Sequence, residues 1–502
     1  MNLDFLHSGS ISFKLGAAGL AVALVVPLSA GSQPVGIPSM GAASSAELSP
    51  RLERTLGDAI MEQGRRDPTY IGDPEVSQYL TEMGRKLAAG APGGAQPITV
   101  FGVRDPEINA FALPGGYIGV NSGLVVSSQN ESQLASVIAH EIGHVVQRHI
   151  ARGMTQQSQN SGVMIASLVA ALLAGLSGNG DLAVGVAAFG QAAAVDRQLG
   201  FSRQAEQEAD RAGFEMLRKA GYDPNGMVQM FTRLMKASRL NEGAGGGAYA
   251  STHPLSIQRL SDIENRVEEL PPIHHRDTDA FWYVRAQLRI MQAMDRSAQQ
   301  DALRQLNLDA TQLTGVRQSA AWYGIAYAAW KKNELSQAET ALPPAQQGGG
   351  PSPALARLSV LLANSRGNGD AALKLAQSAW LRWPGNQGIA LAMIDVMQKN
   401  NRDKEALQFL AQRIKQWPEL PQLHRLQAQS HERLGQKVAA RRAMASYYEQ
   451  TGALSTAVEQ LQQARSLSTD FYTQSELDAQ IRSIKQRLET ERELLQRFKK
   501  QP

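Results

Sequence analysis

Two histidines and a glutamate within five consecutive residues, 140–144, form the part of this sequence best suited to chemistry. If the segment is helical, a step of four residues is about 400°, so His140 and His144 project from the same side, one turn apart. Glu141 lies about 100° round the helix and faces the position that the two rings leave open. This is the layout of a zinc hydrolase. The alternative is a pair of core histidines bonded to backbone groups, so a third ligand must decide.

Apolar residues at helical spacing surround this motif and predict a largely buried helix that starts near Asn130 and Glu131. A buried helix that carries two histidines and a carboxylate needs polar partners, which a divalent cation supplies. The residues after His144 lack the glycine and the more distant histidine of the extended metzincin motif. We therefore expect His149 at the solvated end of the helix and the third ligand elsewhere.

A second helix, predicted at residues 202–220, offers that third ligand. Its polar stripe includes Glu208, which we expect to be solvated, whereas Glu206 and Asp210 lie on the inward side. Glu206 is the candidate metal ligand, and Asp210 lies one turn further on, where it could accept the second ring N–H of a ligating histidine. The alternative is an inward ion pair with Arg197 or Arg203.

Four segments together closely resemble the Ste/Htp-type zinc metallopeptidases: residues 140–144, 202–210, 109–118 and 252–254. With its second half, described below, the chain resembles the BepA-type branch, the periplasmic beta-barrel assembly-enhancing proteases. The resemblance implies roles for five residues: zinc ligands His140, His144 and Glu206, catalytic base Glu141, and Asp210, which orients a ligand. It also implies one Zn²⁺ per chain, with Glu141 taking a proton from the water that the ion activates.

The resemblance further implies that His253 lies on a loop, can occupy the open position of the metal and so keeps the enzyme off. From the residues alone, the segment 252–255 could equally be an ordinary entry to a helix with a polar loop histidine.

A short strand is predicted at residues 117–120, and Gly116, Tyr117 and Ile118 lie where it begins. If this strand is an exposed edge, it could hold an extended substrate by backbone pairing. A plain strand that covers the core is the equal alternative. Further helices at 47–66 and 74–89, and strands at 98–103 and 110–113, complete a mostly helical α+β zinc metallopeptidase domain with a small sheet, expected at residues 50–272.

The second half contains an internal repeat of 34 residues. Small residues recur at this interval, and so do turn-forming residues: Ala338, Ala372, Ala406 and Ala440; Asn333, Gly367, Asn401 and Gly435. A helix–turn–helix unit of this length is typical of tetratricopeptide (TPR) repeats, so we expect an all-α TPR solenoid at residues 273–500. Such an array could be purely structural, but beside a protease it more often selects substrates or docks the enzyme to a complex. By the resemblance, that complex is the outer-membrane beta-barrel assembly machinery.

Residues 1–30 have the pattern of a cleavable signal peptide: Lys14, an apolar run at 15–28 and small residues around Ala30. A retained anchor is the alternative, because the first region is long and carries Asp4. Residues 31–49 predict a linker rich in Gly, Ser, Pro and Ala.

Two apolar stretches, at 163–176 and 182–195, are each too short to cross a bilayer. A buried core hairpin, a lid over the site, and a surface that touches a membrane or an unfolded barrel protein are the alternatives for them.

Composition is that of a folded protein with more than one domain: 502 residues, 43% hydrophobic and 19% charged. The net charge of +4 comes without a Lys/Arg cluster interleaved with aromatics, which argues against nucleic-acid binding. The absence of cysteine excludes disulfides and thiolate zinc ligands.

We therefore expect a periplasmic zinc endopeptidase that degrades misfolded or stalled outer-membrane proteins and assists their assembly. The alternative is a non-proteolytic chaperone or scaffold whose repeats bind such clients and whose metal site is capped. The sequence favours the enzyme, because Glu141 is present alongside all three candidate ligands.

Overall fold

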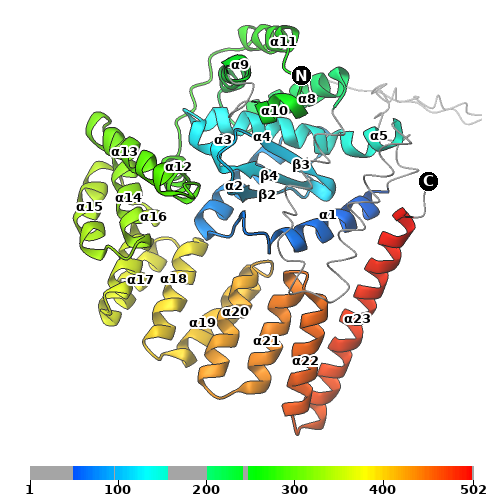
Figure 1. Cartoon of the computed structure of the whole chain (residues 1–502), viewed down its shortest axis with the longest axis vertical. Helices are drawn as coiled ribbons and strands as arrows, with labels where there is room; N and C mark the ends of the chain where they lie inside the picture. The colour runs from blue at the N-terminus through cyan, green and yellow to red at the C-terminus, as the bar shows by residue number, and fades with distance from the viewer. Residues whose placement is uncertain (1–48, 95, 157–200, 241–246, 500–502) are drawn as a thin grey trace, which may run out of the picture.

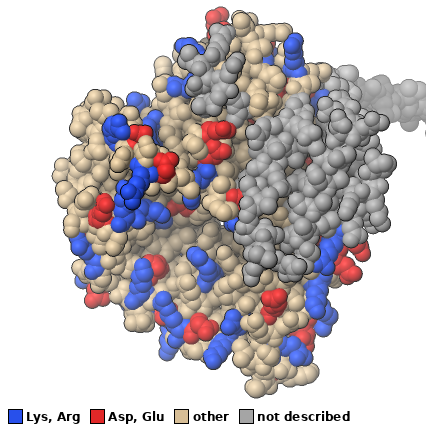
Figure 2. Space-filling view, viewed as in Figure 1, with Lys and Arg blue, Asp and Glu red and all other residues tan. Residues whose placement is uncertain are grey.

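The computed structural model describes residues 49–94, 96–156, 201–240 and 247–499 of the chain, drawn as coloured ribbon in Figure 1. The predicted signal peptide, nearly all of the predicted linker and both apolar stretches lie outside the described residues. Within the described ranges, every helix is too short or too polar to cross a membrane. On the face drawn in Figure 2, Lys and Arg are interspersed with Asp and Glu.

The first half combines a small sheet with helices, so the predicted α+β class is confirmed. Its elements are α1 (Pro50–Gly64), β1 (Tyr70–Ile71), α2 (Pro74–Ala88), β2 (Thr99–Val103), β3 (Ala110–Leu113), η2 (Pro114–Gly116), β4 (Tyr117–Asn121), α3 (Ser122–Ser127), α4 (Glu131–Val146), α5 (His149–Gln156), α8 (Arg203–Lys219), α9 (Asn225–Leu240), α10 (Gly247–Thr252) and α11 (Ile257–Glu268). Local sequence sets the ends of the two key helices. Asn130 caps α4 by accepting a hydrogen bond from the Gln133 N–H, and Ser202 caps α8 in the same way.

The four strands lie in the order β1-β2-β4-β3. β2 and β4 run parallel, with Thr99 opposite Tyr117, and the other two pairs are antiparallel. The reversal between β3 and β4 needs glycine, because Gly116 has a φ of 86° and a Cβ there would lie 2.4 Å from the Pro97 carbonyl oxygen. Helices α2 and α4 pack against the sheet and against each other, so β3 and β4 are buried along their whole length.

The prediction of an exposed edge strand at Gly116, Tyr117 and Ile118 is wrong. β4 pairs with β2 on one side and with β3 on the other, so its backbone groups are used inside the sheet. The edge strand on this side is β3, which packs against α4. An apolar run of this length fits an inner strand as well as an edge strand, so the sequence could not separate them.

Helix α4 is the centre of the first half, and all of its residues from 131 to 145 are buried. α8 crosses it at close range because glycine lies at both contact points. A Cβ at Gly143 would lie 2.7 Å from the Ala209 carbonyl oxygen, and one at Gly213 would lie 3.0 Å from the Ala139 carbonyl carbon. The predicted inward side of α8 is confirmed, since its residues are buried: Glu206, Ala209, Asp210, Gly213 and Leu217. This contact brings the carboxylates of α8 over the histidines of α4.

The second half is all helical: α12 (Asp279–Met291), α13 (Arg296–Gln312), α14 (Gly315–Lys331), α15 (Leu335–Gly348), α16 (Pro353–Ser365), α17 (Gly369–Arg382), α18 (Gln387–Lys399), α19 (Asp403–Gln416), α20 (Pro421–Arg433), α21 (Lys437–Gln450), α22 (Leu454–Leu467) and α23 (Phe471–Lys499). The four alanines of the repeat are at most 3% exposed, where α15, α17, α19 and α21 meet their neighbours. The four predicted turn residues all have φ between 57° and 77°, a left-handed conformation that Asn and Gly tolerate best. The predicted repeat organisation is therefore confirmed.

The repeats form an arc that brings the last helix back to the first (Figure 1). Arg487 of α23 pairs with Glu62 of α1. On the opposite side, Arg357 of α16 lies 3.1 Å from Asp73 and 3.4 Å from Glu75 at the start of α2. One cluster of buried apolar side chains also extends from α2 through α12 and α14 to α16. The two halves therefore share buried contacts at several points.

Candidate metal centre

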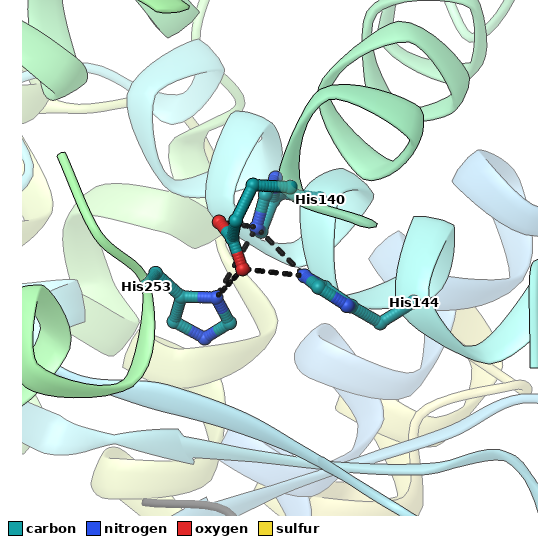
Figure 3. A group of neighbouring side chains, drawn as sticks. His140, His144 and His253 are labelled. Atoms are coloured by element: carbon teal, nitrogen blue, oxygen red, sulfur yellow. Dashed lines mark hydrogen bonds and ion pairs between the residues drawn. The ribbon is translucent and has the colours of Figure 1, made fainter. Parts of the chain in front are cut away.

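Two turns of α4 present the rings of His140 and His144 to one another, as the spacing predicts. Their Nε2 atoms are 3.0 Å apart, and the rings are 2% and 0% exposed. Because both Nε2 atoms point to the same side, they can contact a single ion placed between them (Figure 3).

Glu206 of α8 places its carboxylate against both rings. Oε2 is 3.5 Å from Nε2 of His140, and Oε1 is 3.5 Å from Nε2 of His144. Its side chain is fully buried, so the carboxylate is committed to this cluster.

His253 follows α10 and closes the group from the other side (Figure 3). Its Nδ1 is 3.1 Å from Oε1 of Glu206 and 3.4 Å from Nε2 of His140. Its Nε2 is 3.4 Å from the carboxylate of Glu141. One buried ring thus faces the candidate ligands through one nitrogen and the candidate base through the other.

These four donors fit a zinc ion. A tetrahedral zinc about 2.0–2.1 Å from its ligand atoms separates those atoms by about 3.4 Å. The contacts described above are 3.0–3.5 Å long, with Glu206 facing His140 through Oε2 and facing His144 and His253 through Oε1. Three imidazoles and one carboxylate are also ligand types that zinc accepts.

Asp210 lies behind His140, as the inward position on α8 predicts. Its Oδ1 accepts from Nδ1 of His140 at 2.9 Å, which leaves Nε2 of that ring facing the cluster. Arg259 of α11 holds Asp210 in turn, through hydrogen bonds of 2.7 and 2.8 Å. The same guanidinium reaches Glu206 at 2.7 Å. One arginine therefore fixes both inward-facing carboxylates of α8, those of Glu206 and Asp210.

The electrostatics of the group favour a cation. Burial alone would lower the pKa of His140, but its hydrogen bonds to Asp210 and Glu206 outweigh burial and raise the pKa to about 10. Burial holds the pKa of His144 well below its usual range. Burial would raise the pKa of Glu206, yet the adjoining His253 and His140 hold it well below the usual value. A negative environment that draws a proton onto His140 suits a divalent ion at the same place.

Comparison with known proteins identifies the family to which this chain belongs. The profile of peptidase family M48 matches residues 74–267, and a tetratricopeptide repeat profile matches residues 363–430. A beta-barrel assembly-enhancing protease of Yersinia pestis is 33% identical over 351 residues, which cover 65% of this chain and 68% of that protein. This chain belongs to peptidase family M48.

Two other relatives match shorter parts of this chain. A putative beta-barrel assembly-enhancing protease of Vibrio cholerae is 38% identical over 250 residues, 49% of this chain and 51% of that protein. The mitochondrial metalloendopeptidase OMA1 of Schizosaccharomyces pombe is 36% identical over 169 residues, 33% of this chain and 46% of that protein. The chain therefore spans about half the length of the Vibrio relative that it matches.

The sequence analysis did not identify three residues of the candidate metal centre. Arg259 could have been found, because it lies one turn before Ile263 on the buried side of α11, where a cation needs a partner. Tyr249 and Phe201 stack on the ring of His253, with centroids 4.6 and 5.8 Å away. No local pattern marks these two aromatics, because they meet the histidine only in the folded chain.

The predicted position of His149 is wrong, whereas Glu208 lies on the predicted polar side of α8 and is partly solvated. α4 ends shortly before Arg148, which has a φ of 53°, and this turn brings His149 back under the metal centre, where it is 2% exposed. Its Nδ1 is 2.9 Å from Nδ1 of His144, and its Nε2 is 3.1 Å from Glu208. Glu208 is half-buried and also pairs with Arg152 at 2.6 Å.

A second group of possible ligands joins Glu131, His275 and Asp277 at the start of α4. The Glu131 carboxylate already accepts hydrogen bonds from Thr278, Tyr79 and His275. Because protein donors occupy this carboxylate, the group fixes the start of α12 to α4 and we assign it no metal.

Proposed function

We propose that this protein is a zinc-dependent metalloendopeptidase. The observation that carries the proposal is the convergence of His140, His144 and Glu206 in one buried group, with Glu141 alongside. A zinc ion held there would supply Lewis-acid activation of a water molecule and of the scissile carbonyl group.

The chain's own residues then have distinct tasks. Glu141 accepts the proton of the attacking water and passes it to the leaving amine nitrogen. Asp210, held by Arg259, keeps His140 in the tautomer whose Nε2 faces the ion.

We propose that the described conformation is a resting state capped by His253. A single residue engages both parts that hydrolysis needs, since its Nδ1 lies among the ligands and its Nε2 faces Glu141. His253 has to leave before substrate and water can enter. The same cap is the observation that supports the alternative function, a scaffold for outer-membrane protein biogenesis with a silent metal site.

Substitution of the candidate base tests the enzyme. We expect Glu141→Gln to retain one zinc per chain, measured by elemental analysis, and to cleave casein about 100-fold or more slowly, because general-base catalysis contributes this much. Glu215→Gln on α8 is the matched control, since Glu215 pairs with Arg218 at the surface, and it should keep the wild-type rate. A wild-type rate in Glu141→Gln would exclude Glu141 as the base.

Removal of the cap separates the two functions. We expect His253→Ala to bind zinc and to cleave casein faster than the wild type, because the fourth position becomes open. Equal rates would remove the switch. Zinc binding without cleavage in either protein would favour the scaffold.

We further propose that the protein works in the periplasm on misfolded or stalled outer-membrane proteins. The signal-peptide pattern at residues 1–30 supports export, and the names of the Yersinia and Vibrio relatives support a link to beta-barrel assembly. In this proposal, residues 50–272 cleave and residues 273–500 dock to the barrel-assembly machinery, with peripheral membrane contact as a further interaction. N-terminal sequencing of the exported protein tests cleavage near Ala30, and an intact N-terminus would favour a retained anchor. Photocrosslinking from the repeats to barrel proteins tests the docking.

A further inference from the structure

A chain of three polar residues lies behind His144, on the side away from the other ligands. Nδ1 of His144 is 2.9 Å from Nδ1 of His149, whose Nε2 is 3.1 Å from Oε2 of Glu208. The same carboxylate oxygen accepts from Nη1 of Arg152 at 2.6 Å. These contacts link α4, α5 and α8 and involve none of the residues that hold His140.

The direction of every hydrogen bond in this chain follows from the role of His144. A neutral ring that offers Nε2 to a metal carries its proton on Nδ1. Nδ1 of His144 then donates, so Nδ1 of His149 accepts and the His149 proton lies on Nε2. That proton is donated to Glu208, a carboxylate that Arg152 also holds. A single arrangement of protons therefore satisfies every link.

A similar chain of hydrogen bonds lies behind His140, with one residue fewer. His140 donates directly to Asp210, which Arg259 grips with two hydrogen bonds. Each α4 histidine is thus backed by a carboxylate paired with an arginine. Behind His144, a second histidine bridges the larger gap to the carboxylate.

The backbone is arranged to create this bridge. In a continuous helix, a step of five residues would place His149 about 140° away from His144. The turn at Arg148, with a φ of 53°, instead folds α5 back, and Arg148 is anchored to Glu53 at 3.2 Å. Phe201 packs on the ring of His144, with centroids 4.0 Å apart, and lies 6.1 Å from that of His149, so it helps to keep water from this contact.

We propose that His149, held by Glu208 and Arg152, is a positioning residue that fixes the tautomer and orientation of His144 for metal binding. This inference rests on the proposed metal site. Partners of ligating histidines typically change metal affinity 10- to 100-fold when they are removed, which is about the size of effect we expect.

Three substitutions separate positioning from packing. His149→Leu keeps a side chain of similar bulk but removes the acceptor, and we expect zinc affinity, measured by chelator competition, to fall about 10- to 100-fold. His149→Asn places an amide oxygen where Nδ1 was, and it should restore most of the affinity. Glu208→Gln should give a smaller loss, whereas Glu215→Gln on the same helix should match the wild type.

Cobalt substitution supplies a readout that does not depend on cleavage. The visible absorption bands of the cobalt-loaded protein should shift in His149→Leu and return towards the wild-type spectrum in His149→Asn. An Asn variant as weak as the Leu variant would show that packing alone matters and would overturn the proposal. If His149→Leu does not fold, Glu208→Gln decides, and wild-type affinity in that variant contradicts the chain of contacts. A wild-type protein that binds no zinc would instead reject the proposed function.

Discussion

At the metal centre, His140 and His253 meet although 113 residues separate them in the sequence, whereas helices of the repeat array pack mainly on their neighbours along the chain. The first arrangement is an interlocked group in which one arginine, Arg259, contacts two carboxylates that in turn contact three histidines. The second is a row of similar contacts around small residues such as Ala406.

The two regions should therefore respond differently to mutation and to loss of the metal. Residues that share partners respond together, so a change at one of them should be felt throughout the metal centre. In a repeat array, stability is close to a sum of local terms and contacts between neighbours, so a change should remain local. The following predictions test this contrast, from the largest expected effect to the smallest.

Removal of the metal should affect the two regions most differently. Without a cation, the carboxylates and rings around Glu206 lose a common partner in a buried site, and the lost stabilisation is about 4 kcal/mol where free zinc exceeds its Kd a thousandfold. Hydrogen exchange after chelation should accelerate in α4 and α8 and stay unchanged in α19–α22. Equal acceleration in both regions would contradict the contrast.

A methyl group at the crossing of α4 and α8 should disturb the whole centre. In Gly143→Ala the new Cβ would lie 2.7 Å from the Ala209 carbonyl oxygen, so the helices must separate. We expect a loss of about 3 kcal/mol in the free energy of unfolding and a lower zinc content. Gly385→Ala is the control, since a Cβ there meets nothing within 4 Å. Full zinc content in Gly143→Ala would show that the crossing is more tolerant than we infer.

The matching substitution in the repeats should act only nearby. Ala406 is fully buried, so Ala406→Leu overpacks its contact and should cost about 2 kcal/mol. Exchange should increase in α18–α20, while zinc content and casein cleavage keep their wild-type values. Loss of zinc in this variant would mean that the two regions are coupled more strongly than their contacts indicate.

The contribution to stability of the contact between Glu75 and the repeats should depend on pH. Burial raises the pKa of Glu75 from its ordinary value to about 7, partly offset by Arg357 and reinforced by Asp73, and Tyr323 also faces this carboxyl group. Because the folded pKa is the higher one, this contribution to stability is complete below the unfolded pKa of about 4.5 and is lost as pH rises through 7. Denaturant titrations should show wild type losing about 1–2 kcal/mol more than Glu75→Gln between pH 5 and 8. Parallel pH profiles of the two proteins would refute this assignment.

The smallest effect is expected at a repeat turn. Gly435 has a φ of 72° and open space around it, so Gly435→Ala changes only the backbone preference and should cost about 1 kcal/mol. Thermal unfolding with Gly385→Ala as the control would measure this difference. Equal stability of the two variants would argue against a conformational role for the glycine.

Much of this architecture could be predicted from local pattern. The one-turn spacing of His140 and His144 and the inward position of Glu206 follow from helix geometry, and the structure places all three together. The 34-residue spacing predicted both the buried alanines and the turns, because the repeats have similar helix lengths and place a left-handed Asn or Gly at the same position.

Other features depended on how distant segments meet. The sequence misplaced His149 because a backbone reversal at Arg148 breaks the helical phase on which the prediction relied. It located the strand at Tyr117 but could not decide whether this strand is an edge, because an apolar run does not show how many neighbouring strands pair with it.

By itself, the sequence determined which residues share a helix face and where the repeats recur, since these relations depend on the regular geometry of one segment. The tertiary structure alone decided that Arg259 binds Glu206 and Asp210 of α8, that His149 lies behind His144, and that the repeats curve round to α1. The Arg259 and α1 contacts join segments far apart in the chain, and the His149 contact depends on the turn at Arg148, so their geometry is set by the packing of helices and by the turns between them.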